Sequence, residues 1–232
     1  MKKTAILISG RGSNMAALIE AASDPTFPAG VVGVISDERE APGLTIAASR
    51  GILTQVIARS DFADNSAHDM AIDEALTTLD ADIVALAGYM RILTTPFVEK
   101  WQGRLINIHP SLLPSFRGLN THRRALEAGM RIHGCTVHFV TVKVDEGPII
   151  AQAAVPVLAG DSEQALAARV LKAEHQLYPL ALRLVAEGRA HVRDGRTVLN
   201  LAGASERASA ALVAPDLRPL AENLEDLARF TP

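Results

Sequence analysis

The stretch TAILISGRGSNMAALIEAA, residues 4–22, predicts a strand, a glycine-rich turn and a helix in immediate succession. Residues 4–9 form a short and almost continuous apolar run, which is typical of a strand buried on both faces of a sheet. Gly10 and Gly12 permit a tight turn, and good helix formers follow from Met15 onwards. This order of elements aims the free backbone amides of a helix N-terminus at an anion.

The residues of the turn limit the kinds of anion that could bind there. Met15 stands where the dinucleotide-binding pattern G-x-G-x-x-G requires its third glycine, and the Gly-Lys-Ser/Thr of nucleoside-triphosphate loops does not follow. The cradle formed by Gly12, Ser13 and Asn14 therefore suits a monophosphate. A glycine turn that Ser13 or Asn14 caps without any ligand is an equal alternative at this point.

Further units of the same kind follow along the chain. Apolar runs and helical spacing predict strands at 31–36, 53–58 and 82–88 and helices from about 42 to 51 and over 66–79. Strands that alternate with helices predict an α/β fold, a Rossmann-like, open and mostly parallel twisted sheet with helices on both faces. Ligands of such sheets bind beyond the carboxyl ends of the strands.

The stretch LINIHPSLLPSFRG, residues 105–118, predicts another buried strand and the centre of a reaction site. Period-two alternation places Asn107 and His109 on the same side of the strand, and Pro110 ends the strand directly after them. An amide and an imidazole side by side at the carboxyl end of a strand offer two hydrogen-bond donors to one point. A developing oxyanion requires donors in this arrangement.

The C-terminal half predicts an antiparallel pair of strands on that side of the sheet. Residues 135–142 alternate like an amphipathic strand, and residues 149–157 return after a short loop. The loop carries Asp145, a carboxylate that would orient the ring of His109 and favour its charged form. The sequence also allows Asp145 to be an ordinary turn residue.

Residues from Asp161 onwards predict a long helix and then a hairpin at 191–201. Pro179 is expected to kink or split the helix after Tyr178, because proline removes a helical hydrogen bond. A stripe of apolar residues is expected to face the core. The stripe consists of Leu166, Val170, Ala173, Leu177, Leu180 and Leu184.

The composition of the 232-residue chain limits the function classes. Hydrophobic residues make up 48% of the chain, enough for one substantial core, and 23 basic against 26 acidic residues give a net charge of −3. Without a basic excess, neither nucleic acid nor an anionic membrane is an expected partner. Cys135 is the single cysteine, and no apolar stretch reaches the length of a membrane span, so we expect a cytoplasmic protein. A monomer or a homodimer is expected, and the sequence does not decide between them.

Metal sites and serine-hydrolase sites are disfavoured. None of the seven histidines pairs with another at i, i+4, so no metal site is expected. Ser111 lies close to His109, but no G-x-S-x-G elbow surrounds it. His122, His133 and His138 are expected to be structural or to lie on the surface.

The segment NIHPSLLP, residues 107–114, closely resembles the folate-dependent formyltransferase family. The resemblance extends from residue 4 to about residue 186 and includes further motifs at 12–14, 90–93, 118–122, 137–140 and 145–148. It implies transfer of the formyl group of 10-formyltetrahydrofolate, the co-substrate, to the glycinamide amine of a ribose 5-phosphate substrate in purine synthesis. The expected partners are therefore two small molecules.

The resemblance also implies a role for each matching residue. Asn107, His109 and Asp145 match the catalytic residues, and Glu174 matches a position that contacts the glycinamide substrate. The phosphate contacts fall on Gly12, Ser13 and Asn14. The folate contacts fall on Met90, Arg91, Ile92, Leu93, Asn107, Thr141, Val142, Lys143, Val144 and Asp145. We expect one catalytic domain over residues 1–202, with the N-terminal half on the phosphate side and the C-terminal half on the folate side. Residues 203–232 are expected to form a tail that could hold a short helix.

One position in the predicted folate site departs from the family. Asn65 stands where relatives often have an arginine, in the loop after the third strand. If that arginine grips the folate, the grip in this chain is weaker or comes from another residue, for example Arg59.

Other activities stay open. A formyltetrahydrofolate hydrolase could use the same residues with water as the nucleophile, but relatives of that kind carry an additional N-terminal domain, whereas the first core strand is expected at Thr4 here. A methionyl-tRNA formyltransferase would need a basic, RNA-binding C-terminal domain, which the Ala- and Glu-containing tail does not supply. A folate- or phosphate-binding module without turnover is the non-enzymatic alternative.

Overall fold

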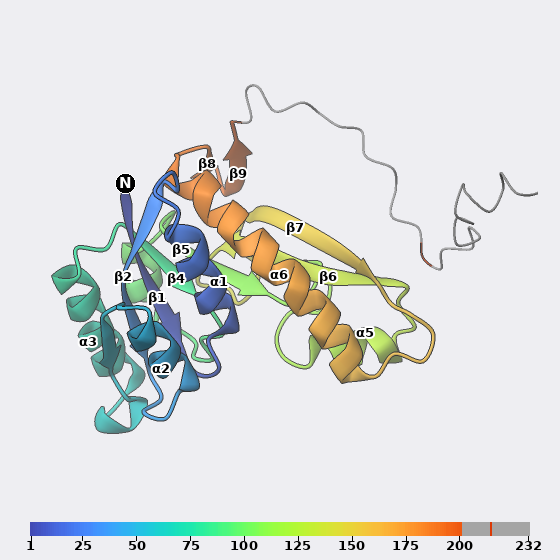
Figure 1. Cartoon of the computed structure of the whole chain (residues 1–232), viewed down its shortest axis with the longest axis horizontal. Coiled ribbons are helices and arrows are strands. Elements are labelled where there is room, and N and C mark those ends of the chain that lie inside the picture. Colours follow the sequence, from blue (N-terminus) through green and yellow to red (C-terminus); the bar gives the residue numbers. More distant parts are fainter. Residues whose placement is uncertain (201–213, 215–232) are drawn as a thin grey trace, which may run out of the picture.

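A seven-stranded sheet forms the centre of the computed structural model, which describes residues 1–200 and Ala214 (Figure 1). The strands lie in the order β3-β2-β1-β4-β5-β6-β7. They comprise β1 Lys2–Ile8, β2 Ala29–Ser36, β3 Thr54–Val56, β4 Ile83–Leu86, β5 Leu105–His109, β6 Ile132–Phe139 and β7 Ile149–Pro156. Neighbours from β3 to β5 run parallel, whereas β6 and β7 each run antiparallel to the strand before them. The predicted Rossmann-like sheet with an antiparallel pair on its C-terminal side is confirmed.

Helices cover both faces of the sheet and bury β1 completely beyond its first two residues. They comprise α1 Ser13–Ala22, α2 Pro42–Ser49, α3 Asn65–Thr78, α4 Thr95–Lys100, α5 Thr121–Glu127 and α6 Glu163–Ala186, with a short 3-10 helix, η1, at Arg59–Asp61. Ile6 and Ile8 of β1 belong to one core, with residues of α1, α2 and α6. Ala5 and Leu7 point the other way, into a second core with α3 and α4. The continuous apolar run of β1 therefore serves two cores, as predicted.

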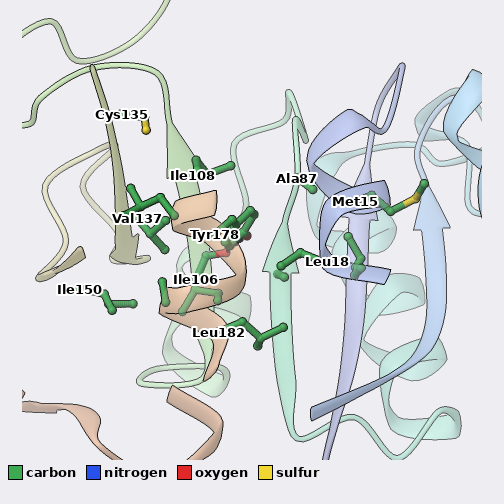
Figure 2. Close-up of a cluster of buried hydrophobic side chains, with 14 of the residues drawn as sticks. Met15, Leu18, Ala87, Ile106, Ile108, Cys135, Val137, Ile150, Tyr178 and Leu182 are labelled. Carbon is green, nitrogen blue, oxygen red and sulfur yellow. Dashed lines mark hydrogen bonds between the residues drawn. The ribbon is translucent and has the colours of Figure 1, made fainter. Parts of the chain in front are cut away.

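The helix α6 connects the two ends of the site that is described below. It packs against α1, β6 and β7, and Figure 2 shows its Tyr178 and Leu182 among Leu18 of α1 and Ile106 of β5. The hydroxyl of Tyr178 donates to the backbone oxygen of Leu86, at 2.9 Å, and lies 3.2 Å from that of Ile106. The helix is thereby tied to the two strands β4 and β5.

The expectation that Pro179 splits this helix is wrong. The helix continues without interruption from Glu163 to Ala186, with Pro179 inside it. Proline in a helix interior costs about 3 kcal/mol. Leu177, Tyr178 and Ala181 are buried on either side of the proline, and this burial offsets the cost.

The predicted apolar stripe of α6 is wrong at Leu180, whose side chain is 50% exposed. The predicted stripe alternates steps of four and three residues over its whole length, and the observed row does not. The buried row runs through Leu166, Val170, Glu174, Leu177, Ala181 and Leu184. Because this row takes two steps of four at its start, it passes through Glu174 and Ala181 instead of Ala173 and Leu180. Glu174 is thereby turned into the protein.

The strand predicted at 135–142 as amphipathic is also corrected. The observed β6 ends at Phe139, and all but its first residue are buried. Cys135, Val137 and Phe139 face the core that includes α6. On the opposite face, the loop after β5 covers the strand, and the backbone N–H of Leu113 donates to Oγ1 of Thr136 at 3.0 Å. The polar residues that alternate along β6 therefore face a second contact surface inside the protein and not solvent.

The remaining predictions concern the two ends of the described chain. The predicted hairpin is confirmed as β8 Ala190–Arg193 and β9 Arg196–Leu199, which pair antiparallel. The predicted tail at 203–232 falls outside the described residues, apart from Ala214. Within the described part, no helix is both long enough and apolar enough to cross a membrane.

Candidate active site

Three segments meet at the carboxyl ends of the neighbouring strands β1, β4 and β5. The turn at 9–14 follows β1, the segment at 88–93 follows β4, and β5 ends at His109. The first two are joined directly, because the backbone N–H of Ser9 donates to the backbone oxygen of Gly88 and Oγ of Ser9 accepts from the backbone N–H of Met90. The rim predicted from the strand pattern is therefore continuous between the segments after β1 and β4.

The glycine turn after β1 needs its glycines for steric reasons. Gly12 has φ 71° and forms the N-cap of α1. A Cβ atom at Gly12 would lie 2.8 Å from Cα of Gly43, whose backbone N–H donates to the backbone oxygen of Gly10 at 3.0 Å. The turn is thus pressed against the start of α2, and only glycine fits at this approach.

The first turn of α1 leaves backbone amides available to an anion. No side chain forms a capping hydrogen bond there, and the first turn contains no acidic residue. The alternative in which Ser13 or Asn14 caps the turn is therefore not observed. An uncapped helix start carries unsatisfied N–H groups and a partial positive charge, which together attract a phosphate.

Asn14 joins the predicted phosphate cradle to Glu174. Its Nδ2 donates to Oε2 of Glu174 at 2.7 Å, and its Oδ1 has no partner among the described residues. Glu174 is 6% exposed, and burial raises the pKa of its carboxyl group, while the bond from Asn14 lowers it. The two residues, which the resemblance assigns to the same substrate, are in direct contact.

The predicted catalytic residues form one group at the end of β5. Nδ1 of His109 lies 3.4 Å from Oδ2 of Asp145, and Nε2 of His109 donates to the backbone oxygen of Phe116 at 3.0 Å. Each ring nitrogen of His109 therefore faces an oxygen acceptor. Nδ2 of Asn107 lies 3.3 Å from Nε2 of His138, which in turn lies 3.8 Å from Oδ1 of Asp145. The group comprises Asn107, His109, His138 and Asp145.

Local backbone geometry carries Asp145 to this group. The loop 140–148 returns from β6 to β7, and Asp145 has φ 53°, a left-handed conformation. A Cβ atom at Gly147 would lie 1.7 Å from the backbone oxygen of Phe139, so only glycine allows the loop to close against the end of β6. The backbone N–H of Gly118 donates to Oδ2 of Asp145 at 2.8 Å and fixes the carboxylate from the other side.

His138 is the member of this group that the sequence reasoning missed as a site residue. It is 2% exposed, and burial lowers the pKa of its imidazole, although the Asp145 carboxylate opposes this shift. Its Nδ1 donates to the backbone oxygen of Phe139 at 2.9 Å. Its Nε2, without a proton in the neutral ring, can then accept from Asn107, which fixes the orientation of that amide. The cross-strand register, which pairs Asn107 with His138, was the signal that could have found it.

The predicted folate segments expose apolar side chains. Met90 and Ile92 in the segment after β4 are exposed, and so are Val142 and Val144 in the loop after β6. Large apolar side chains gathered on an open surface are typical of a binding site. Oδ2 of Asp69 accepts from the backbone N–H of Thr94 at 2.6 Å and holds the end of the first segment in place.

Asn65 brings two arginines together beside this segment. Its Oδ1 accepts from Nε of Arg59 at 2.9 Å and also from Nη2 of Arg91. Neither arginine forms an ion pair with a carboxylate among residues 1–200. The alternative in which Arg59 supplies the grip on the folate stays a prediction.

Comparisons with known proteins agree with these motifs. The sequence model of the formyl transferase family matches residues 2–182. The phosphoribosylglycinamide formyltransferase of Escherichia coli is 45% identical over 195 residues, which cover 84% of this chain and 92% of the relative. The crystal structure of phosphoribosylglycinamide formyltransferase from Brucella melitensis is 60% identical, with a TM-score of 0.77, over 80% of this chain and 95% of that chain.

A longer relative contains the same unit as one part. The trifunctional purine biosynthetic protein adenosine-3 of Bos taurus is 52% identical over 186 residues, which cover 80% of this chain. The match spans 18% of the length of the bovine protein. The solved structure agrees with the fold described above, and the family model and the sequence relatives cover most of the same residues. The chain belongs to the formyl transferase family.

Proposed function

We propose that this protein is a phosphoribosylglycinamide formyltransferase, which transfers the formyl group of 10-formyltetrahydrofolate to the glycinamide amine of N1-(5-phosphoribosyl)glycinamide. The observation that carries the proposal is the contact between Asn14 and Glu174 on the same rim as the group around His109. It joins the phosphate cradle to the carboxylate that is proposed to contact the glycinamide part of the substrate. The names of the relatives reported above support the same reaction.

The phosphate end of the substrate would bind at the start of α1. The backbone N–H groups of Ser13 and Asn14 would donate hydrogen bonds to the phosphate oxygens, because these N–H groups have no acceptor within the helix. Glu174 would accept hydrogen bonds from the rest of the substrate. Asn14 holds its carboxylate at the edge of the cradle, which limits the positions that the amine can take.

The reaction would proceed through a tetrahedral intermediate. The neutral amine nitrogen attacks the formyl carbon and forms a C–N bond, and the carbonyl oxygen becomes an alkoxide. An N–H of Asn107 donates a hydrogen bond to this oxygen. The Nε2–H of His109, which donates to the backbone oxygen of Phe116 in the structure, would exchange that acceptor for the alkoxide, and Asp145 on the Nδ1 side orients the ring. The bond between the formyl carbon and the folate nitrogen then breaks. The proton of the attacking nitrogen passes to that folate nitrogen through His109 or a held water.

The folate would lie along the exposed apolar side chains at 90–93 and 141–144. Main-chain groups of these segments would recognise the polar edge of its ring. Arg59 and Arg91, held together by Asn65, would receive a carboxylate of the same molecule, since two guanidinium groups without acidic partners attract an anion. The cytoplasm as compartment, and a monomer or homodimer as assembly, stay predictions from the sequence.

Formyl transfer is tested with 10-formyltetrahydrofolate in the presence and absence of the glycinamide ribonucleotide. Loss of the formyl group only with the amine present, together with a formylated product, is the expected result. Equal loss without the amine would make the enzyme a hydrolase. Binding of either molecule without loss of the formyl group would make it a binding protein.

A further inference from the structure

The loop between β5 and α5 contacts both members of the His109–Asp145 pair through its backbone. The backbone oxygen of Phe116 accepts from Nε2 of His109, and the backbone N–H of Gly118 donates to Oδ2 of Asp145. The two loop residues are separated by Arg117 alone. A shift of this short segment would therefore disturb the histidine and the carboxylate together.

The segment has left-handed backbone conformations at three positions, two of them at residues other than glycine. Phe116 has φ 53°, Gly118 has φ 75° and Asn120 has φ 56°. Left-handed conformations at residues other than glycine cost about 1–3 kcal/mol each and persist only where surrounding contacts determine them. Contacts from outside the segment must therefore hold it.

Arg124 of α5 provides such contacts from one side chain. Its Nη1 donates to the backbone oxygen of Arg117 at 2.6 Å and lies 3.3 Å from that of Leu119. Its guanidinium carbon lies 5.5 Å from the ring centroid of Phe116. One planar cation thus contacts three of the four residues from 116 to 119. Hydrogen bonds from a charged donor are stronger than those between neutral groups.

Among the described residues, the side-chain contacts of Arg124 are those with this segment. Arg124 is exposed and forms no ion pair among the residues that the structure describes, whereas the adjacent Arg123 lies 3.8 Å from Glu163. Further ties of the segment include the edge contact of the Phe116 ring with the ring of His133, whose centroids are 6.0 Å apart, and an ion pair between Arg117 and Glu146 at 2.7 Å. That pair is exposed, and such pairs contribute little. The main restraint on the loop from α5 is therefore Arg124.

We propose that Arg124 is a positioning residue, which locks the 116–119 segment and through it sets the orientation of His109 and Asp145. Arg124 does not touch the reacting atoms. The inference rests on the catalytic roles proposed for His109 and Asp145. It adds a residue outside the rim to the determinants of the reaction.

The test compares Arg124→Ala and Arg124→Lys with Arg123→Ala, a matched control on the same helix. We expect Arg124→Ala to lower kcat by about 10- to 100-fold, since small misplacement of reacting groups has effects of this size. The KM for the phosphorylated substrate should change by less than about twofold, because the cradle on α1 lies on separate elements. Arg124→Lys should recover part of kcat, and Arg123→Ala should retain full activity.

A spectroscopic readout separates this inference from the proposed function. In protein labelled with ¹⁵N-histidine, the imidazole signals of His109, assigned with His109→Gln, should move in Arg124→Ala but not in Arg123→Ala. Unmoved signals in Arg124→Ala, or equal losses of kcat in both alanine variants, would overturn the inference. If the wild-type protein transferred no formyl group but the signals moved, the proposed function would fail and the positioning role would stand.

Discussion

Asn14 and Glu174 are 160 positions apart in the chain, and the amide of one donates to the carboxylate of the other at 2.7 Å. The contact lies where α1 packs against α6, and both side chains are almost fully buried. A carboxylate in this position is not needed for packing. The proposed function gives this carboxylate a role in substrate binding.

Removal of the Asn14 side chain should weaken binding of the phosphorylated substrate. Asn14→Ala leaves the buried carboxylate of Glu174 without its hydrogen bond, which should cost about 1–3 kcal/mol of stability. The KM for the glycinamide ribonucleotide should rise, while the KM for 10-formyltetrahydrofolate stays near its original value. Steady-state kinetics with each substrate varied and thermal unfolding measure the two effects. An equal change in both KM values would contradict the assignment.

Glu174 should make the stability of the protein depend on pH. Burial raises the pKa of Glu174 above its ordinary value of 4.5, so the folded state binds its proton more tightly than the unfolded chain. This contribution to stability is complete below pH 4.5 and is lost as the pH rises through the folded value. Glu174→Gln removes the dependence. The free energy of unfolding, measured with urea at pH 5 and pH 8, should therefore rise for the variant relative to the wild type as the pH rises. A constant difference between the two proteins would refute the prediction.

Asn107 should contribute to turnover much more than to stability. Asn107→Ala removes one of the two proposed donors to the alkoxide, and loss of such a donor lowers kcat by about 10²–10³-fold. The side chain is only partly buried, so the thermal midpoint should change little. Turnover within about threefold of the wild type would exclude an oxyanion role for this amide.

The arginine pair at Asn65 should determine affinity for the folate and not for the phosphorylated substrate. Asn65→Leu removes the oxygen that accepts from Arg59 and Arg91. We expect the KM for 10-formyltetrahydrofolate to rise several-fold, with Arg59→Ala giving a similar change. Arg39→Ala is the matched control, because Arg39 pairs with Asp61 instead. Similar effects of all three variants would mean that general charge, and not this pair, acts on the folate.

Gly147 should be far less tolerant of substitution than an open glycine. A Cβ atom at Gly147 would collide with the backbone oxygen of Phe139, so Gly147→Ala must displace the loop that carries Asp145. Both kcat and the thermal midpoint should fall. Gly160→Ala, where φ is 79° but no atom lies within 4 Å of the new methyl group, should cost only about 1 kcal/mol and leave kcat unchanged. Comparable kinetics of the two variants would show that the loop adapts.

The sheet and the grouping of the three proposed catalytic residues could be predicted from the sequence because they depend on local patterns. The run at 4–9 is apolar at residues 5–8 since β1 faces two cores, and the strand at 105–109 is ended by Pro110. Such features follow from periodicity and from the chemistry of single residues. The motifs of the family then assigned roles that the patterns alone left open.

The errors arose where distant segments decide the structure. Pro179 is tolerated inside α6 because the sheet binds the helix on either side of it. The place of His138 in the site could not be predicted locally, because only the register between β5 and β6 shows that it contacts Asn107. The role of Asn65 as an acceptor for two arginines also depends on segments that are distant in the sequence, since Arg91 follows β4. Local propensity contains none of this information.

Tyr178 lies one helical turn beyond Glu174 on the same face of α6, and its hydroxyl binds the backbone of β4 and β5. Burial raises the pKa of this phenol well above its ordinary range, so it keeps its proton under all physiological conditions. The carboxylate beside the phosphate cradle and the strand that presents Asn107 are consequently parts of one inflexible frame. In the proposed reaction, the phosphate end of the substrate and the formyl carbon would therefore be held on either side of one continuous helix, and no hinge between two lobes would be required to bring the reactants together.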